Sequence, residues 1–256
     1  MKRISAFAGR NLRELLRDPL SYLFCIGFPL VMLVIMTLVD RSIPAQANMN
    51  VFHLDHLTPG IIMFGQTFVM LFTALTVSHD RAGAFLMRLY ASPMTATDFA
   101  VGYILPMLVI SVLQTAVTFA AAWVIALITG TTLSAGGTLL CFVSMLPAAV
   151  MYISIGLLFG TIFHEKSAPG LCSVIISLNS FLGCIFFDAD GTGGVLLTVC
   201  KCLPFYYCTK TARGAMLMNL TAEQYWIPLL VTVGSAAIAL FLGMFAFSRR
   251  MLADLS

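Results

Sequence analysis

The chain has 256 residues, of which 60% are hydrophobic and 10% are charged, with a formal net charge of +3. A soluble globular domain carries about 25% charged residues, so this composition excludes an ordinary soluble enzyme. The 14 basic and 11 acidic residues all fall outside six long apolar stretches. Each stretch has about the 20 residues that a helix needs to cross a bilayer. We therefore predict an all-α membrane protein with one transmembrane domain over 1–256, and spans at 20–39, 59–78, 99–128, 138–160, 168–187 and 227–247.

Residues 1–18 predict an amphipathic helix, with apolar side chains such as Phe7 and Leu15 at helical spacing and Arg10 four residues before Glu14. A basic amphipathic helix beside a membrane lies in the interface. The segment is either a basic leader that sets topology or also a docking surface, and the pattern is compatible with both. Cleavage as a signal peptide is disfavoured, because 20–39 is longer than the 7–15 residues of a signal h-region.

The basic residues predict the topology. With six spans both termini lie on one side, and that side then holds ten lysines and arginines against four on the other. The positive-inside rule makes the ten-residue side cytoplasmic. We expect a multi-pass protein of the plasma membrane, of the bacterial inner-membrane kind, with both termini in the cytoplasm.

Local signals predict several helix ends and contacts. Thr58 is expected to cap the second span with Pro59 at its first position, and Thr97 or Asp98 to cap the third. Gly156 and Gly160 form a GxxxG pattern, which favours close helix packing, here within the chain.

The segment 188–226 contains apolar stretches too short to span. Stretches of about 10–14 apolar residues are more often re-entrant or interfacial than spanning. We predict two short helices in the outer leaflet, Val195–Cys202 and Cys208–Met218, with a plain external loop as the alternative.

No catalytic, cofactor-binding or metal-binding set assembles. The sequence has no Gly-Lys dipeptide and hence no P-loop, and His164-Glu165 begins a zincin-like motif that fails at Ala168. His53, Asp55 and His56 are three polar residues on one loop, which are more often solvated than metal-bound. Three cysteines, Cys200, Cys202 and Cys208, lie close together in the sequence, where they could form a disulfide or, less favoured, bind zinc.

The loop after the second span is patterned, with 81–90 forming a short amphipathic helix and Ser92-Pro93 a turn. A series of motifs follows in order along nearly the whole chain: Arg10-Asn11-Leu12-Arg13, Arg17-Asp18-Pro19, Phe28-Pro29-Leu30, Leu57-Thr58-Pro59-Gly60-Ile61, Asp80-Arg81 with Gly83, Leu89-Tyr90-Ala91-Ser92-Pro93-Met94, Leu203-Pro204 and Ala212-Arg213-Gly214-Ala215. In these motifs the chain resembles a known family, the ABC-2-type transporter permeases, and in particular the short drug- and antibiotic-export members.

The resemblance implies a six-span, non-catalytic subunit that pairs with a second permease, as a homodimer or heterodimer. ATP and Mg²⁺ would be bound by a separate ATP-binding subunit, and no cofactor by this chain. It also implies that the N-terminal helix and the loop after the second span contact that subunit, through Arg10, Arg13, Arg17, Arg81, Arg88 and Leu89. The chain departs from the family at 84–87, where relatives usually carry a polar, acid-containing run.

The residues alone also indicate that any transport is driven by energy supplied from outside the membrane domain. The spans contain no ionisable groups and therefore lack the buried carboxylates of ion-driven pumps. Gln66, Gln114 and Asn179 either line a translocation path or serve as packing contacts between helices. The apolar spans suit a hydrophobic drug, a lipid or an amphipathic peptide. The alternatives are an ion-coupled secondary transporter or channel and, less favoured, a lipid-modifying membrane enzyme. No nucleic-acid partner is expected.

Overall fold

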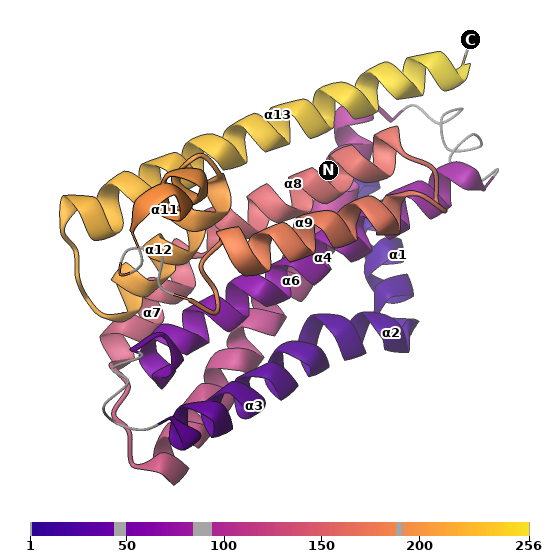
Figure 1. Ribbon diagram of the computed structural model, residues 1–256. Helices are drawn as coiled ribbons and strands as arrows, with labels where there is room; N and C mark the ends of the chain where they lie inside the picture. The colour runs from indigo at the N-terminus through magenta and orange to yellow at the C-terminus, as the bar shows by residue number, and fades with distance from the viewer. Residues whose placement is uncertain (1, 44–49, 84–93, 188–190, 192, 256) are drawn as a thin grey trace.

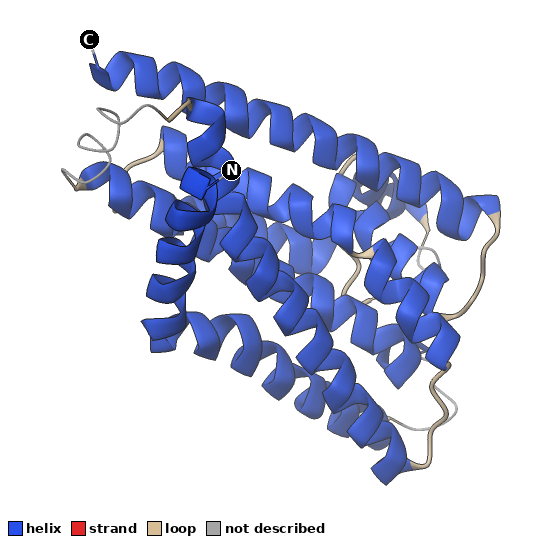
Figure 2. Cartoon of the chain, turned by 180° about the vertical axis from the view of Figure 1, so that it is seen from behind, coloured by secondary structure: helices blue, strands red, loops and turns tan. Residues whose placement is uncertain are grey.

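The computed structural model describes residues 2–43, 50–83, 94–187, 191 and 193–255, and within these it contains helices and no strands (Figures 1 and 2). The N-terminal half contains α1 (Lys2–Arg17), α2 (Pro19–Tyr22), α3 (Phe28–Ser42), α4 (Leu54–Ala82) and α6 (Ala96–Thr129). The C-terminal half contains α7 (Ala135–Ser144), α8 (Leu146–Ile162), α9 (Ala168–Leu182), α11 (Gly194–Lys201), α12 (Pro204–Met216) and α13 (Ile227–Leu255).

Five helical segments of the described chain are long and apolar enough to cross a membrane: Pro19–Ser42, Leu54–Ala82, Ala96–Thr129, Ala135–Ile162 and Ala222–Met251. They correspond to five of the six predicted spans. The remaining stretch, 168–187, contains the shorter apolar helix α9, whose 15 residues reach only about 22 Å against a hydrocarbon core of about 30 Å. α9 ends early because Gly183 caps it and Cys184 takes a positive φ of 56°, which turns the chain.

Helix α4 lies at the centre of the bundle. It packs on α3, α6, α8, α9 and α12, while α13 covers the far side of α8. Figure 1 shows α13 and α2–α3 along opposite edges, with α1 crossing the end of the bundle against α6. Phe7 of α1 meets Tyr103 of α6 edge to face, with ring centroids 5.1 Å apart.

The buried side chains of the segment α2–α3 form a single stripe against the bundle. Its buried residues are Ser21, Cys25, Pro29 and Leu33, which follow one another at intervals of four. A π-helical turn, Leu23–Gly27, joins the two helices. Phe24 and Phe28 beside this stripe contact Phe68 of α4, whereas Leu20, Leu23, Val31, Val34 and Leu38 are exposed.

Gly156 and Gly160 of α8 allow close helix packing, as the GxxxG pattern predicts. A Cβ on Gly160 would lie 2.6 Å from the carbonyl oxygen of Ala74, and one on Gly156 would lie 2.7 Å from Thr73 Cβ. Both neighbours belong to α4, so the two glycines allow α4 and α8 to pack backbone against backbone.

Two predicted helix starts are wrong. Helix α4 begins at Leu54, so Thr58 and Pro59 lie inside it, and the Thr58 hydroxyl donates to the Leu54 carbonyl at 2.6 Å. Asp55 in the first turn favours this earlier start, because a carboxylate there meets the positive end of the helix dipole. Helix α6 is capped by Thr95, with Asp98 completing a capping box rather than acting as the cap.

The two short helices before the last span are present and differ from the predicted ones only in where they begin and end. The helices expected at 195–202 and 208–218 are α11 and α12, and α12 begins four residues earlier than expected because Pro204 occupies its first turn. The fourth predicted span is two helices that meet at Met145, just before Pro147. All seven cysteines are free thiols, and only Cys202 is exposed.

Candidate functional site

The C-terminal turn of α4 holds three consecutive polar residues, each bonded to a different part of the chain. We call these three, His79, Asp80 and Arg81, together with Arg10, Tyr103 and Glu165, the α4 terminal cluster. It lies where α1, α4, α6 and the α8–α9 connection meet.

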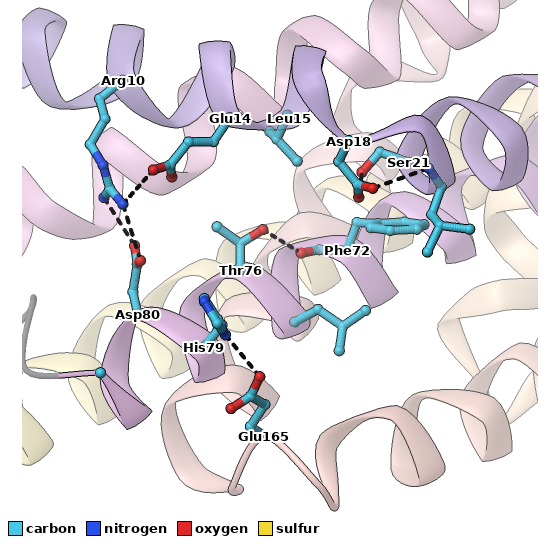
Figure 3. Close-up of a pocket in the computed structure, with 13 residues that line it drawn as sticks. Arg10, Glu14, Leu15, Asp18, Ser21, Phe72, Thr76, His79, Asp80 and Glu165 are labelled. Atoms are coloured by element: carbon cyan, nitrogen blue, oxygen red, sulfur yellow. Dashed lines mark hydrogen bonds and ion pairs between the residues drawn. The ribbon is translucent and has the colours of Figure 1, made fainter.

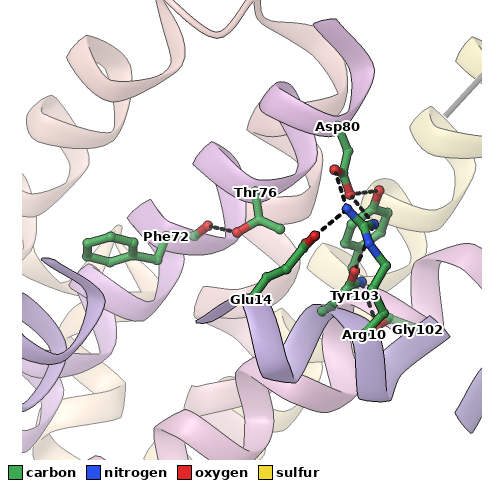
Figure 4. Close-up of polar contacts among 8 residues, drawn as sticks. Arg10, Glu14, Phe72, Thr76, Asp80, Gly102 and Tyr103 are labelled. Atoms are coloured by element: carbon green, nitrogen blue, oxygen red, sulfur yellow. Dashed lines mark hydrogen bonds and ion pairs between the residues drawn. The ribbon is translucent and has the colours of Figure 1, made fainter. Parts of the chain in front are cut away.

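Asp80 is the buried centre of this cluster. Its side chain is 6% exposed, accepts a hydrogen bond from the Tyr103 hydroxyl at 2.8 Å, and pairs with Arg10 at 3.3 Å. Arg10 also pairs with Glu14 at 2.7 Å, the i,i+4 contact that the sequence predicts (Figure 4). A carboxylate with so little exposure is stable only when it is paired and hydrogen-bonded, and Arg10 and Tyr103 supply both.

The acidic neighbours of Arg10 raise its pKa. Partial burial by itself lowers the pKa of the Arg10 guanidinium, but the hydrogen bonds and charges of Asp80 and Glu14 raise this pKa above its ordinary value. Arginine is a permanent cation in proteins, and here that cation joins α1 to α4.

Arg81 joins α4 to α8. Its Nη1 donates to the backbone carbonyl oxygen of Gly160 at 3.1 Å and also to that of Thr161. The last carbonyls of a helix have no partners within the helix, and a cation there also matches the negative end of the helix dipole. His79 Nδ1 meets Glu165 Oε1 at 2.8 Å, which adds a contact to the α8–α9 connection.

Next to the cluster lies a cavity of about 640 Å³, between the α1–α2 corner and α4 (Figure 3). We call it the α1–α4 groove. Asp18 is at the corner, where its carboxylate caps α2 by accepting from the Leu20 amide at 3.1 Å and the Ser21 hydroxyl at 2.7 Å. The groove is lined by Arg10, Glu14, Leu15, Asp18, Leu20, Ser21, Phe72, Leu75, Thr76, His79, Asp80, Gly83 and Glu165.

The structure brings two of the predicted partner contacts, Arg10 and Arg81, into the same cluster, where both bond within the chain. Arg13 and Arg17 are exposed on α1. Arg88 and Leu89, and with them most of the predicted 81–90 helix, lie outside the described residues.

The three polar residues predicted for a translocation path are buried inside the single chain. Gln66 Nε2 donates to Gln114 Oε1 at 3.0 Å and to Thr115 Oγ1 at 3.2 Å, and Ser111 donates to Gln66 Oε1 at 2.7 Å. Asn179 is fully buried in α9 and accepts from the Tyr152 hydroxyl at 2.6 Å. These contacts join α4 to α6 and α8 to α9.

If Gln66 is a packing contact, Gln66→Leu is expected to lower the unfolding free energy by about 1–2 kcal/mol, since each hydrogen bond between membrane helices contributes about 0.6 kcal/mol and partners are left unpaired. Thermal unfolding in detergent measures this loss. The matched double variant, Gln66→Leu with Gln114→Leu, should lose less unfolding free energy than the sum of the two single variants. It removes both amides, so neither is left buried without the other. Unchanged stability with altered transport would instead support a path-lining role.

The sequence reading did not identify Asp80, Tyr103 or Glu165 as site residues, and it did not foresee the role of Arg213. Arg213 of α12 donates to the carbonyl oxygens of His56 at 3.1 Å and Ile185 at 3.0 Å, which fixes the first turn of α4. Two features of the sequence point to this cluster. The Asp80-Arg81 pair directly follows an apolar span, and Phe99 and Tyr103 are four residues apart, on one face of a helix.

A family model described as ABC-2 type transporter matches residues 2–217, which is more than half of the chain. No curated protein matches the chain. The match agrees with the long apolar helices, which make this a multi-pass membrane protein. The chain therefore belongs to the ABC-2 type transporter family, as a membrane-spanning permease component of an ABC transporter.

Proposed function

We propose that this permease is the membrane subunit of an ATP-driven exporter of a hydrophobic or amphipathic compound, such as a drug, antibiotic, peptide or lipid. A separate ATP-binding subunit hydrolyses ATP with Mg²⁺ on the cytoplasmic side, and a second permease completes the translocation path. The chain itself carries out no chemistry.

The α4 terminal cluster is the observation that supports this proposal. It ties the central helix to α1 through Arg10 and Asp80, to α6 through Tyr103 and to α8 through Arg81. A partner that pushes on this end therefore acts on three helices besides α4. If the partner binds two conformations of the bundle with different affinity, its nucleotide cycle shifts their populations.

The proposed contact surface consists of Arg10, Arg13, Arg17, Arg81, Arg88 and Leu89. Within it, Arg13 and Arg17 offer exposed charges to the partner, whereas Arg10 and Arg81 hold α4 in place. The ion-coupled alternative gains no support from Asp80, since this carboxylate is already neutralised by Arg10.

Reversing the charge of Arg13 and Arg17 to glutamate tests the proposal. The chain is co-expressed with a candidate ATP-binding subunit, and both ATP-dependent transport in proteoliposomes and the amount of co-purified subunit are measured. Transport and co-purification are expected to fall at least tenfold, because repulsion replaces attraction at a rim of the interface.

The control variant, Arg249→Glu with Arg250→Glu, makes the same charge change on exposed residues of α13. It should keep most of the transport activity. Failure of every candidate subunit to bind the wild-type chain, or transport driven by a cation gradient without nucleotide, would refute the proposed function.

A further inference from the structure

The α1–α4 groove has the size and the apolar wall of a small-molecule site. Its volume of about 640 Å³ lies within the 300–1,000 Å³ typical of pockets for drug-sized ligands. Leu20, Phe72 and Leu75 form part of its wall, and Leu20 is 56% exposed. This apolar surface is available to a ligand in the structure of the single chain.

The polar wall of the groove is acidic. Glu14, Asp18, Asp80 and Glu165 line it, against Arg10 and His79, so its net charge stays negative even when His79 is protonated. The side chains of Glu14 and Glu165 are 51% and 46% exposed. A carboxylate has about four acceptor sites, so each can take a further donor beside its present partner.

This acidity is unusual for its position. The side of the membrane on which the groove is expected to lie carries ten lysines and arginines of the chain. Anionic lipid headgroups are attracted to such basic surfaces but are repelled by the carboxylates of the groove. A cation is attracted, and the apolar wall favours one with a bulky hydrophobic body.

We propose that the α1–α4 groove binds an amphipathic organic cation. Its apolar body lies against Leu20, Phe72 and Leu75, and its positive charge lies near Glu14 and Glu165. That this cation is also the transported compound rests on the proposed function; its binding to the groove does not.

The test uses two ions of matched shape and opposite charge, tetraphenylphosphonium and tetraphenylborate. Binding to the full-length chain in nanodiscs of zwitterionic lipid is measured by equilibrium dialysis, with empty nanodiscs as the baseline. We expect saturable binding of tetraphenylphosphonium and none of tetraphenylborate above the baseline. Saturable binding of both ions alike, or of neither, overturns the proposal.

Two variants locate the bound cation. Glu14→Gln with Glu165→Gln removes two exposed charges and is expected to weaken tetraphenylphosphonium binding about tenfold, since opposite charges a few ångströms apart at a protein surface attract each other. Thr76→Trp fills the groove with an indole and is expected to abolish saturable binding. The control Glu223→Gln changes one exposed charge before α13, at the other end of the bundle, and should bind as the wild type does.

Unchanged binding in the glutamine variant overturns the proposal, even if Thr76→Trp abolishes binding, because the ligand would then not be recognised by its charge. If Thr76→Trp does not fold, as judged by size-exclusion chromatography, the glutamine variant decides alone. The binding assay contains no ATP-binding subunit. Failure of the exporter proposal would therefore appear as missing ATP-driven transport with cation binding intact.

Discussion

Replacing Asp80 with alanine is expected to lower the unfolding free energy by about 2–3 kcal/mol. Removing one partner of a buried ion pair typically costs about 3–5 kcal/mol, because the other charge is left uncompensated. The loss is smaller here, since the Arg10 side chain is 32% exposed and keeps its contact with Glu14. The buried Tyr103 side chain also loses its hydrogen bond to Asp80.

Thermal and chemical unfolding of the purified chain in detergent measure this effect, and a double-mutant cycle isolates the pair. Asp80→Asn, Arg10→Met and the double variant should give a coupling energy of about 1–3 kcal/mol, as expected for groups in one network. Tyr103→Phe removes a single hydrogen bond and should cost about 1 kcal/mol. A melting temperature for Asp80→Ala equal to that of the wild type would show that the cluster does not hold α4.

Replacing Gly156 or Gly160 with leucine is expected to prevent α4 and α8 from packing. Even a Cβ at position 160 would lie 2.6 Å from the Ala74 carbonyl oxygen and 2.8 Å from Val77 Cβ, and backbone atoms cannot yield as a flexible side chain can. Overpacking of a well-packed core costs about 1–3 kcal/mol for small additions, so we expect that loss for alanine and loss of the folded protein for leucine.

The yield of monodisperse protein and its melting temperature are the measurements. Gly170→Ala in α9 is the matched control, because a Cβ there meets nothing within 4 Å. The control should change stability by no more than about 0.5 kcal/mol. A Gly156→Leu variant with wild-type yield and melting temperature would mean that α4 and α8 do not approach as closely as described.

Features that depend on local spacing could be predicted from the sequence. The Arg10–Glu14 pair and the packing role of Gly156 and Gly160 each follow from two residues four apart on one helix, and the structure confirms both. Helix starts were less predictable. Thr58-Pro59 has the form of a helix start, but the helix begins at Leu54 and accommodates the proline inside it.

The partners of charged residues could not be predicted. The sequence gives Arg10 and Arg81 as cations near span ends, but their partners, Asp80 and the α8 carbonyls, are 70 and 79 or more residues away along the chain. Only the tertiary packing of α1, α4 and α8 brings these groups together. The groove is likewise formed by segments distant in sequence, so no short motif could predict it.

The single stripe of Ser21, Cys25, Pro29 and Leu33 has a mechanical consequence. Helix α4 is held at its start by Arg213 and at its end by Asp80 and Arg81, so it moves only together with its neighbours. The segment α2–α3 rests on α4 through apolar contacts that include Phe24 and Phe28, and Asp40 near its end pairs with His53 at 3.4 Å. Its π-helical turn, Leu23–Gly27, is the natural point of flexure between α2 and α3. Leu20 and Ser21, which line the groove, precede this turn, so bending there would move α3 while the groove wall keeps its shape.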